Sequence, residues 1–178
     1  MESAIRSVYE IVTGNKISSI FEKGNIIEIR GFEGIKYIEL PIENIGEVPD
    51  ILKPHFEDFT FLKGVTLKAA VCHGTENARK VLDDIKSGGK FSQCHFIEFM
   101  ACPGGCLGGG GQPIPTSAEI RKKRAEAIYK EDESATVRKS YENPAVIELY
   151  KNFLNYPDSD VSKKYLHTFY TVRGNRIV

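Results

Sequence analysis

The chain has no excess of either charge, and this absence limits the partners to be expected. Its 24 lysines and arginines are balanced by 24 aspartates and glutamates, so there is no electrostatic case for binding nucleic acid or an anionic membrane. The longest apolar runs are far too short to cross a bilayer. Met1 to Arg6 lack the basic and apolar segments of a secretory signal. A chain of 178 residues, 41% hydrophobic and 27% charged, is typical of one globular domain with a sizeable core.

Cysteine is scarce as well, and its spacing excludes the commonest thiol motifs. Three residues separate Cys102 from Cys106, so the chain has no C-x-x-C redox motif. With so few thiols, we expect a reducing cytoplasm in which they bind metal and do not form disulfides. A zinc site would need a second pair of ligands at regular spacing, and the remaining candidates do not form one: Cys72, Cys94, His73 and His95.

Against this background, the stretch from Met100 to Pro113 is unusual. It holds both Cys102 and Cys106 and six of the sixteen glycines, four of them consecutive at Gly108 to Gly111. Such a run is costly in conformational entropy, and it suits a backbone that turns through positive φ or presses against a bulky group. Two thiolates beside it favour a metal–sulfur cluster. A phosphate-binding loop would need Lys followed by Ser or Thr after the glycines. A plain glycine turn with two incidental thiols remains the alternative.

The order of the expected elements predicts an α/β fold with a parallel βαβ core. An apolar run at 67–72 indicates a buried strand, the stripe over 76–86 a helix, and residues 94–100 the next strand. Strands joined by such a crossover are parallel. The cysteine stretch follows the carboxyl end of the second strand, where open α/β sheets bind ligands. Upstream we expect a helix over 3–13, strands at 26–30 and 35–40 joined by a turn, and a connection over 41–64 with one short helix after Gly46.

Helices are expected after the cysteine stretch. Thr116 to Glu119 reads as a capping box that begins a helix running to about Lys130, whose basic residues mostly line a solvated face. Asn143 followed by Pro144 is typical of a helix start, and a short helix is expected over 161–167. The helix after Pro144 carries an apolar stripe that needs a partner surface: Val146, Leu149, Tyr150, Phe153 and Leu154.

Phe96 to Pro113 resembles the third cysteine motif of the [FeFe]-hydrogenases, the iron-only hydrogenases. Ile5 to Gly14 resembles the helix after the family's Gly-Gly-Val turn, and Arg30 to Lys36 its Arg-Gly-x-Glu-Gly-Ile element. Leu166 to Thr171 resembles the hydrogenase small subunit, which some members carry as a separate chain. The resemblance implies one lobe of the iron-only hydrogenase fold with a helical tail: residues 1–115 as the C-terminal lobe of the H-cluster catalytic domain and residues 116–178 as a helical small-subunit-like region.

The same resemblance implies a cofactor and its ligands. The H-cluster is a [4Fe–4S] cubane joined to a diiron subsite that carries CO, cyanide and an azadithiolate, and four cysteines hold it. By residue matching, Cys102 is a terminal ligand of the cubane, Cys106 bridges the cubane to the diiron subsite, and Met100 lines the diiron subsite. A plain core methionine is the alternative for Met100. The glycines expected against the cofactor are Gly104, Gly105, Gly108 and Gly109.

We expect simpler, mostly structural roles for the other cysteines and for the histidines. Cys72 and Cys94 match no family ligand and are expected to be small buried residues. His73, at the carboxyl end of a strand, is expected near the site, whereas His95 and His167 are expected to be structural.

One departure from the family pattern decides the expected partner. The first two cysteine motifs, Thr-Ser-Cys-Cys-Pro and Pro-Cys-x-x-Lys, are missing from this sequence. A second hydrogenase chain should therefore supply the other cysteines, the acid–base groups and the route to an electron carrier. The expected function is that of one subunit of a split, oxygen-sensitive [FeFe]-hydrogenase that interconverts protons and H₂.

Two alternatives stay open. One is a hydrogenase-like Fe–S assembly or sensory protein without hydrogen turnover; such proteins usually have Ser for the first glycine of the motif and a broken glycine run. The other is an inert fragment of a longer chain.

Overall fold

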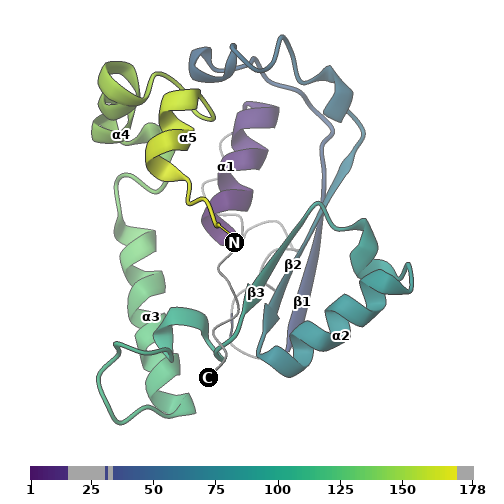
Figure 1. Ribbon diagram of the computed structural model, residues 1–178, viewed down its shortest axis with the longest axis vertical. Coiled ribbons are helices and arrows are strands. Elements are labelled where there is room, and N and C mark those ends of the chain that lie inside the picture. Colours follow the sequence, from purple (N-terminus) through teal and green to yellow (C-terminus); the bar gives the residue numbers. More distant parts are fainter. Residues whose placement is uncertain (16–30, 32–33, 172–178) are drawn as a thin grey trace.

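The protein consists of a small sheet with a helix on either face and a helical arm beyond one of these helices (Figure 1). The computed structural model describes residues 1–15, 31 and 34–171. The strand expected at 26–30 and residues 32–33 of the turn after it lie outside the described residues. Among the described residues no helix is long and apolar enough to cross a membrane.

The described sheet has the strand order β1-β2-β3, with β1 at Ile35–Pro41, β2 at Thr66–His73 and β3 at Phe96–Met100. β1 and β2 are antiparallel. β2 and β3 are parallel, in a register that runs from Ala69 opposite Phe96 to His73 opposite Met100. The parallel βαβ unit predicted from the sequence is therefore confirmed, and His73 and Met100 lie side by side where the two strands end.

The central strand β2 is covered on both faces, which explains its continuous apolar run. On one face Ala69 and Val71 pack with Ile5 of α1 (Glu2–Thr13). The other face lies beneath α2 (Thr75–Lys86), whose Val81 is fully buried. Cys72, on this second face, has no exposed surface. The apolar stripe expected on α2 is only partly buried, because Leu82 is 46% exposed.

Two glycines bring the end of α1 against the connection that follows β1. Gly14 ends α1 with φ 68°, a left-handed cap of the kind its sequence indicated. A Cβ on Gly46 would lie 2.6 Å from the Gly14 nitrogen, so only glycine permits this approach. The connection holds two 3₁₀ turns, Asp50–Leu52 (η3) and Thr60–Leu62 (η4), in place of the single short helix expected.

The helical arm consists of α3 (Ala118–Ser134), α4 (Pro144–Leu149), which continues as a π turn over Tyr150–Leu154, and α5 (Asp160–Leu166). The Asn143 side chain accepts the Ala145 N–H at 3.0 Å, as its sequence predicted. The capping box predicted at Thr116 is wrong by one residue. Ser117 caps α3 by accepting the Ile120 N–H at 3.1 Å, and the helix ends four residues beyond Lys130.

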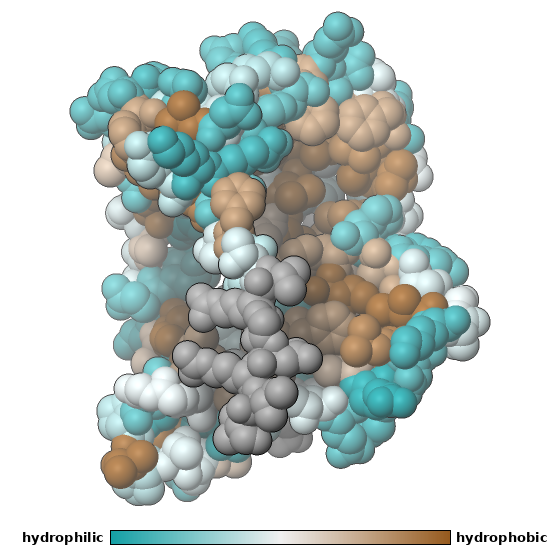
Figure 2. Space-filling model, in the orientation of Figure 1, coloured by the Kyte–Doolittle hydropathy of each residue, from teal (hydrophilic) through white to brown (hydrophobic). Residues whose placement is uncertain are grey.

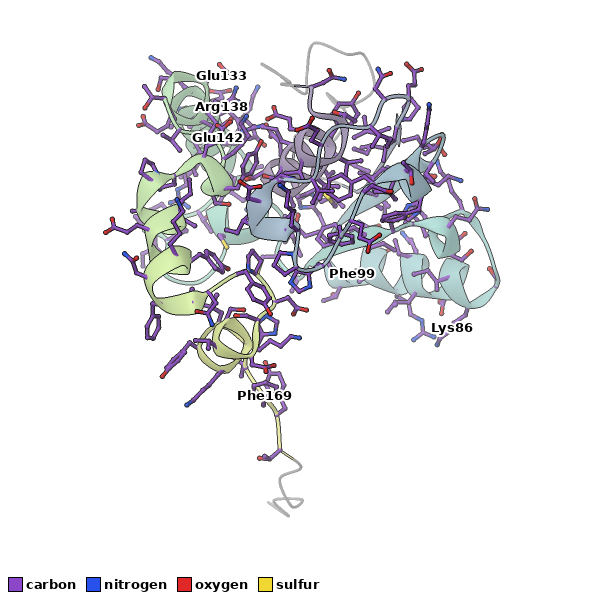
Figure 3. All side chains as sticks on the ribbon, turned by 90° about the horizontal axis from the view of Figure 1, so that it is seen from above. Lys86, Phe99, Glu133, Arg138, Glu142 and Phe169 are labelled. Carbon is purple, nitrogen blue, oxygen red and sulfur yellow. The ribbon has the colours of Figure 1, made fainter. Side chains whose placement is uncertain are left out.

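Charged side chains join the helical arm to α1. The Arg6 side chain is 2% exposed and pairs with Glu2 at 2.8 Å and with Asp132 of α3 at 3.2 Å. Asp132 also pairs with Arg138 at 2.6 Å. Figure 3 shows Arg138 near the end of α3, on the side of the molecule where α1 approaches it. These contacts fix the orientation of α3 relative to the sheet.

The apolar stripe predicted on the arm is covered only in part. Leu154 is 2% exposed, but Leu149 is 48% and Phe153 50% exposed. Beyond α5, Phe169 projects away from the body of the protein (Figure 3). Apolar surface also shows on the sheet side of the molecule (Figure 2). On β3, Phe96 and Phe99 are each more than 40% exposed.

Candidate metal–sulfur site

The cysteine loop, residues 101–113, leaves the carboxyl end of β3 and begins with tight turns. The Gly105 N–H donates to the Cys102 carbonyl at 2.9 Å, and the Leu107 and Gly108 N–H groups donate to Gly104 and Gly105 at 3.2 Å each. The middle of the loop is a 3₁₀ turn at Gly105–Leu107. Cys102 and Cys106 are both free thiols and both exposed. The loop therefore presents two thiols on an open surface of this chain.

Two glycines shape the turn between the thiols. Gly104 has φ 82° and Gly105 has φ 57°, a region that side chains other than glycine's rarely adopt. A Cβ on Gly105 would lie 2.7 Å from the Met100 Sδ atom. The sequence predicts that Gly105 lies against the cofactor. Within the described chain, the group that lies against Gly105 is the thioether of Met100.

The four consecutive glycines differ from one another in their surroundings. A Cβ on Gly108 would lie 2.5 Å from Arg121 Cδ and 2.8 Å from the Pro103 carbonyl oxygen, whereas one on Gly109 would make ordinary contacts. Around Gly110 and Gly111 the described chain leaves open space, although Gly111 has φ 89°. Contacts within the described chain therefore account for Gly108, and the backbone conformation accounts for Gly111, but neither accounts for Gly109 or Gly110.

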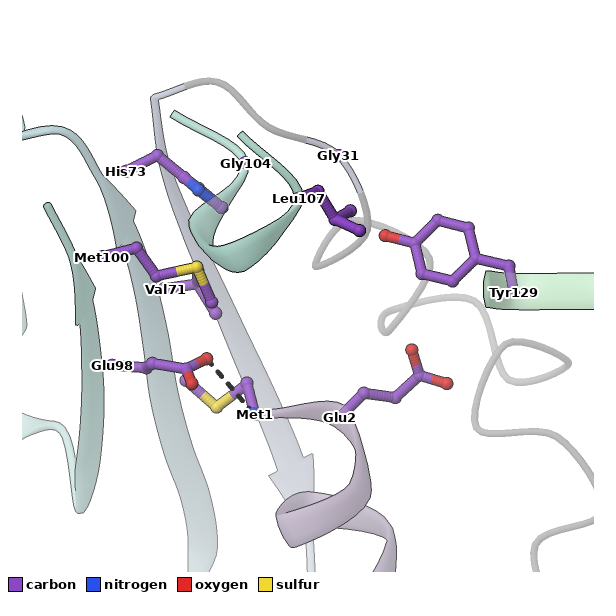
Figure 4. Close-up of a pocket in the computed structure, with 10 residues that line it drawn as sticks. All are labelled: Met1, Glu2, Gly31, Val71, His73, Glu98, Met100, Gly104, Leu107 and Tyr129. Atoms are coloured by element: carbon purple, nitrogen blue, oxygen red, sulfur yellow. Dashed lines mark ion pairs between the residues drawn. The ribbon is translucent and has the colours of Figure 1, made fainter. Parts of the chain in front are cut away.

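A cavity of about 180 Å³ lies behind the loop (Figure 4). Met100 and Gly104 line it together with His73, Glu98, Leu107 and Tyr129. His73 is 6% exposed, and within the described residues neither ring nitrogen has a hydrogen-bond partner. Burial, assisted by the Lys36 charge, lowers the pKa of His73, so the ring is neutral at pH 7. Buried polar atoms usually have a partner, so this ring has hydrogen-bonding capacity that the described residues do not use.

The other two thiols are unsuited to ligand binding. Burial raises the pKa of the Cys72 thiol, which lies in the core as expected. Cys94 is half-buried, and burial raises the pKa of its thiol too. Across residues 1–15, 31 and 34–171, no group of three or more His, Cys, Asp or Glu side chains could hold a metal ion.

Sequence reasoning missed two residues of α3 that contact the loop. Arg124 donates from Nη1 to the Leu107 carbonyl at 2.9 Å and from Nη2 to the Pro113 carbonyl at 2.8 Å. Arg121 lies against Gly108. Most basic residues of this helix were expected on a solvated face. The spacing of three residues does place these two on one side of the helix, but no local signal indicates that this side meets the loop.

Two exposed thiols on a glycine-shaped loop, at the carboxyl edge of a parallel βαβ unit, are the arrangement that is typical of Fe–S sites held by cysteine thiolates. Comparison with known families makes this specific. Residues 1–110 match the family described as iron only hydrogenase large subunit, C-terminal domain, and residues 118–173 match the iron hydrogenase small subunit. The chain belongs to the iron-only, or [FeFe], hydrogenase family. The boundary predicted at residue 115 stays a prediction.

Individual relatives agree. The chain is 38% identical over 175 residues to the NADP-reducing hydrogenase subunit HndD of Solidesulfovibrio fructosivorans, covering 97% of this chain and 25% of that one. It resembles the solved structure of an apo [FeFe]-hydrogenase HydA1 variant from Chlamydomonas reinhardtii, with a TM-score of 0.73 and 33% identity, covering 96% of this chain and 43% of that one. It is also 32% identical over 120 residues to the cytosolic Fe-S cluster assembly factor narfl of Danio rerio, covering 65% of this chain and 28% of that one. The chain thus spans about a quarter of the length of HndD.

The residues present fit part of the H-cluster that this family binds. The thiols of Cys102 and Cys106 are free and accessible. The glycine turn at Gly104 and Gly105 carries no Cβ, and the buried ring of His73 has unused hydrogen-bonding capacity. Two thiols are half of the four cysteines that the resemblance implies. The described chain therefore suits one side of the cofactor.

Proposed function

We propose that this chain is one subunit of a split [FeFe]-hydrogenase, which catalyses 2H⁺ + 2e⁻ ⇌ H₂. In this proposal Cys102 and Cys106 hold the H-cluster, and a second hydrogenase chain supplies the remaining cysteines. One observation carries the proposal: two exposed thiols stand on a glycine-shaped loop beside Met100, in a chain of the hydrogenase family. The proposed location is a reducing cytoplasm, because free thiols persist there.

The chain's own residues have distinct roles in this proposal. Cys102 and Cys106 act as thiolates, since the thiolate is the form that binds iron. The H-cluster, when bound, supplies the redox chemistry and the binding of hydrogen. Met100 stays in place because Gly105 leaves room for its sulfur atom, and its soft apolar side chain shields the cofactor from water. His73, neutral and without a partner in the described chain, can donate one hydrogen bond toward a bound group.

The need for a partner follows from the incomplete ligand set. The described residues present two thiols suited to iron, and the proposed cofactor needs four. Exposed apolar side chains on β3 and on the helical arm offer surface for a second chain. Electrons are proposed to arrive through that chain, because within the described residues no further group of three or more His, Cys, Asp or Glu side chains could hold an accessory metal cluster. The proton route is proposed to lie there as well, with the two missing cysteine motifs.

Purification from the native host without oxygen tests this proposal. We expect the chain to co-purify with a polypeptide that contains the two missing cysteine motifs, and the complex to evolve H₂ from a reduced low-potential dye. A chain that carries iron with such a partner but never turns over hydrogen would contradict the proposed activity.

A second function is favoured by one finding, the 32% identity to a protein named as a cytosolic Fe-S cluster assembly factor. In that case the loop would hold an Fe–S cluster without a diiron subsite. Iron and sulfide would then be found in equal amounts, with no activity toward H₂.

A further inference from the structure

The glycine run in the second half of the cysteine loop has few hydrogen bonds of its own. Between Gly108 and Gln112 one backbone bond is present in the described loop, from the Gln112 N–H to the Gly109 carbonyl at 3.5 Å, which is long for such a bond. Glycine loses more conformational freedom on folding than any other residue. The 3₁₀ turn restrains Cys106 on one side, but the glycine run that follows it needs anchors from outside itself if the loop is to keep one position.

Arg124 provides such an anchor at both ends of the run. Its two Nη atoms reach the carbonyls of Leu107 and Pro113 at 2.9 and 2.8 Å, so one planar guanidinium closes the segment between them. Hydrogen bonds from a charged donor are about twice as strong as neutral ones. A lysine has one ammonium in place of the fork and cannot reproduce this geometry. Arg121, one turn earlier, lies against Gly108 and restricts the same segment from the side.

The helix that carries Arg124 is itself held firmly. Ala125, the next residue, is 2% exposed. Near the far end of α3, Asp132 pairs with the buried Arg6 of α1. The loop is thus tied through α3 to the helix that packs against the sheet, and the region matched by the small-subunit family holds the loop that carries the two cysteines.

We propose that Arg124 is a positioning residue: it clamps the glycine run between Leu107 and Pro113 and thereby fixes the thiolate of Cys106 for the cofactor. The part that concerns the cofactor rests on the proposed function, whereas the clamp itself does not. This assigns a task to the small-subunit-like region, which contributes a side chain to the site's shape without contacting iron.

Hydrogen exchange tests the clamp in the native protein prepared without its cofactor. In Arg124→Gln we expect exchange of the hydrogen-bonded loop amides, those of Leu107, Gly108 and Gln112, to rise by about tenfold or more, because two charge-assisted hydrogen bonds that hold the segment are lost. Arg124→Lys should give a smaller rise. Lys123→Gln is the matched control, since Lys123 is its neighbour, carries the same charge and is 73% exposed in a pair with Glu119; it should leave the loop unchanged. Exchange in β2 should stay the same in all three variants.

A spectroscopic measurement tests the consequence for Cys106. In cofactor-loaded Arg124→Gln we expect broadened or shifted CO and cyanide infrared bands relative to the wild type, with Lys123→Gln identical to the wild type. Unchanged loop exchange, or a rise of equal size in β2, overturns the clamp. Faster loop exchange with unaltered bands overturns its role in positioning Cys106. If the wild type binds no cofactor, the proposed function fails, and the exchange comparison still decides the clamp.

Discussion

Cys72 on β2 and Cys106 in the cysteine loop have the same side chain, but the first is buried and the second is exposed. Cys72 has no exposed surface, and the three residues before it, Ala69 to Val71, are 1–2% exposed. Cys106 is exposed, as is Cys102. The apolar groups in the second half of the strand are covered by α1 and α2. The difference teaches that this chain buries the centre of its sheet with its own residues but leaves its cysteine loop exposed.

The largest expected effect concerns the loop. Cys106→Ser or Cys102→Ser should lower the affinity for the cofactor by more than about a hundredfold, since even residues that only contact a metal ligand contribute ten- to a hundredfold to metal affinity. The anaerobically purified variants should therefore contain much less iron. Cys94→Ser is the control, because the half-buried Cys94 matches no ligand. Iron quantification would measure this. Equal iron in Cys106→Ser and in the control would contradict the assignment of the ligands.

The next effect concerns the ion pairs that join α1 to α3. Arg6→Met should lower the free energy of unfolding by about 2–3 kcal/mol, because it removes the ion pairs that the buried Arg6 guanidinium makes with Glu2 and Asp132. Lys80→Met should change it by less than about 0.5 kcal/mol, since its pair with Glu76 is exposed. Urea unfolding distinguishes the two. A similar loss for both would show that the contact between α1 and α3 is not an important restraint.

A smaller effect separates the glycines of the loop. Gly105→Ala should destabilise the loop by about 1–2 kcal/mol, because alanine is strained at φ 57° and its Cβ would meet Met100. Gly110→Ala has open space in the described chain and should leave the stability of the chain within about 0.5 kcal/mol.

Cofactor loading then sharpens the comparison between these two glycines. If Gly110→Ala folds normally but no longer accepts the cofactor, a group from outside this chain lies against Gly110. Equal unfolding curves for Gly105→Ala and the wild type would contradict the close approach to Met100.

The smallest effect is a dependence of the free energy of unfolding on pH, through His73. The pKa of His73 is lowered in the folded chain, so the unfolded chain binds a proton more readily as the pH falls. Stability should therefore be complete above pH 6.5, the ordinary value, and decline below it by at most about 1.4 kcal/mol per pH unit. His73→Gln should remove this slope. An identical slope in both proteins, measured by urea unfolding between pH 7 and pH 5, would contradict the neutral buried ring.

Local patterns in the sequence predicted the parts of the fold that depend on neighbours in the chain. The parallel pairing of β2 and β3, the left-handed cap at Gly14 and the helix start at Asn143 all follow from short-range signals. These signals also placed the cysteine loop at the carboxyl edge of the sheet.

Contacts between distant residues could not be predicted in this way. Arg6 and Asp132 are 126 positions apart, and the sequence between them does not indicate that α1 and α3 meet. The clamp of Arg124 and the approach of Gly105 to Met100 likewise depend on where whole elements pack. The choice of Ser117 over Thr116 as the cap depends on the path of the loop before α3, since either side chain can accept the bond.

The central claim is that Cys102 and Cys106 hold an H-cluster together with cysteines from outside this sequence. The most direct test is an infrared spectrum of the protein purified anaerobically from its native host, recorded over the CO and cyanide stretching region. We predict sharp bands of both ligands, which Cys106→Ser abolishes and Cys94→Ser retains. Iron without such bands, or bands that persist in Cys106→Ser, would contradict the claim.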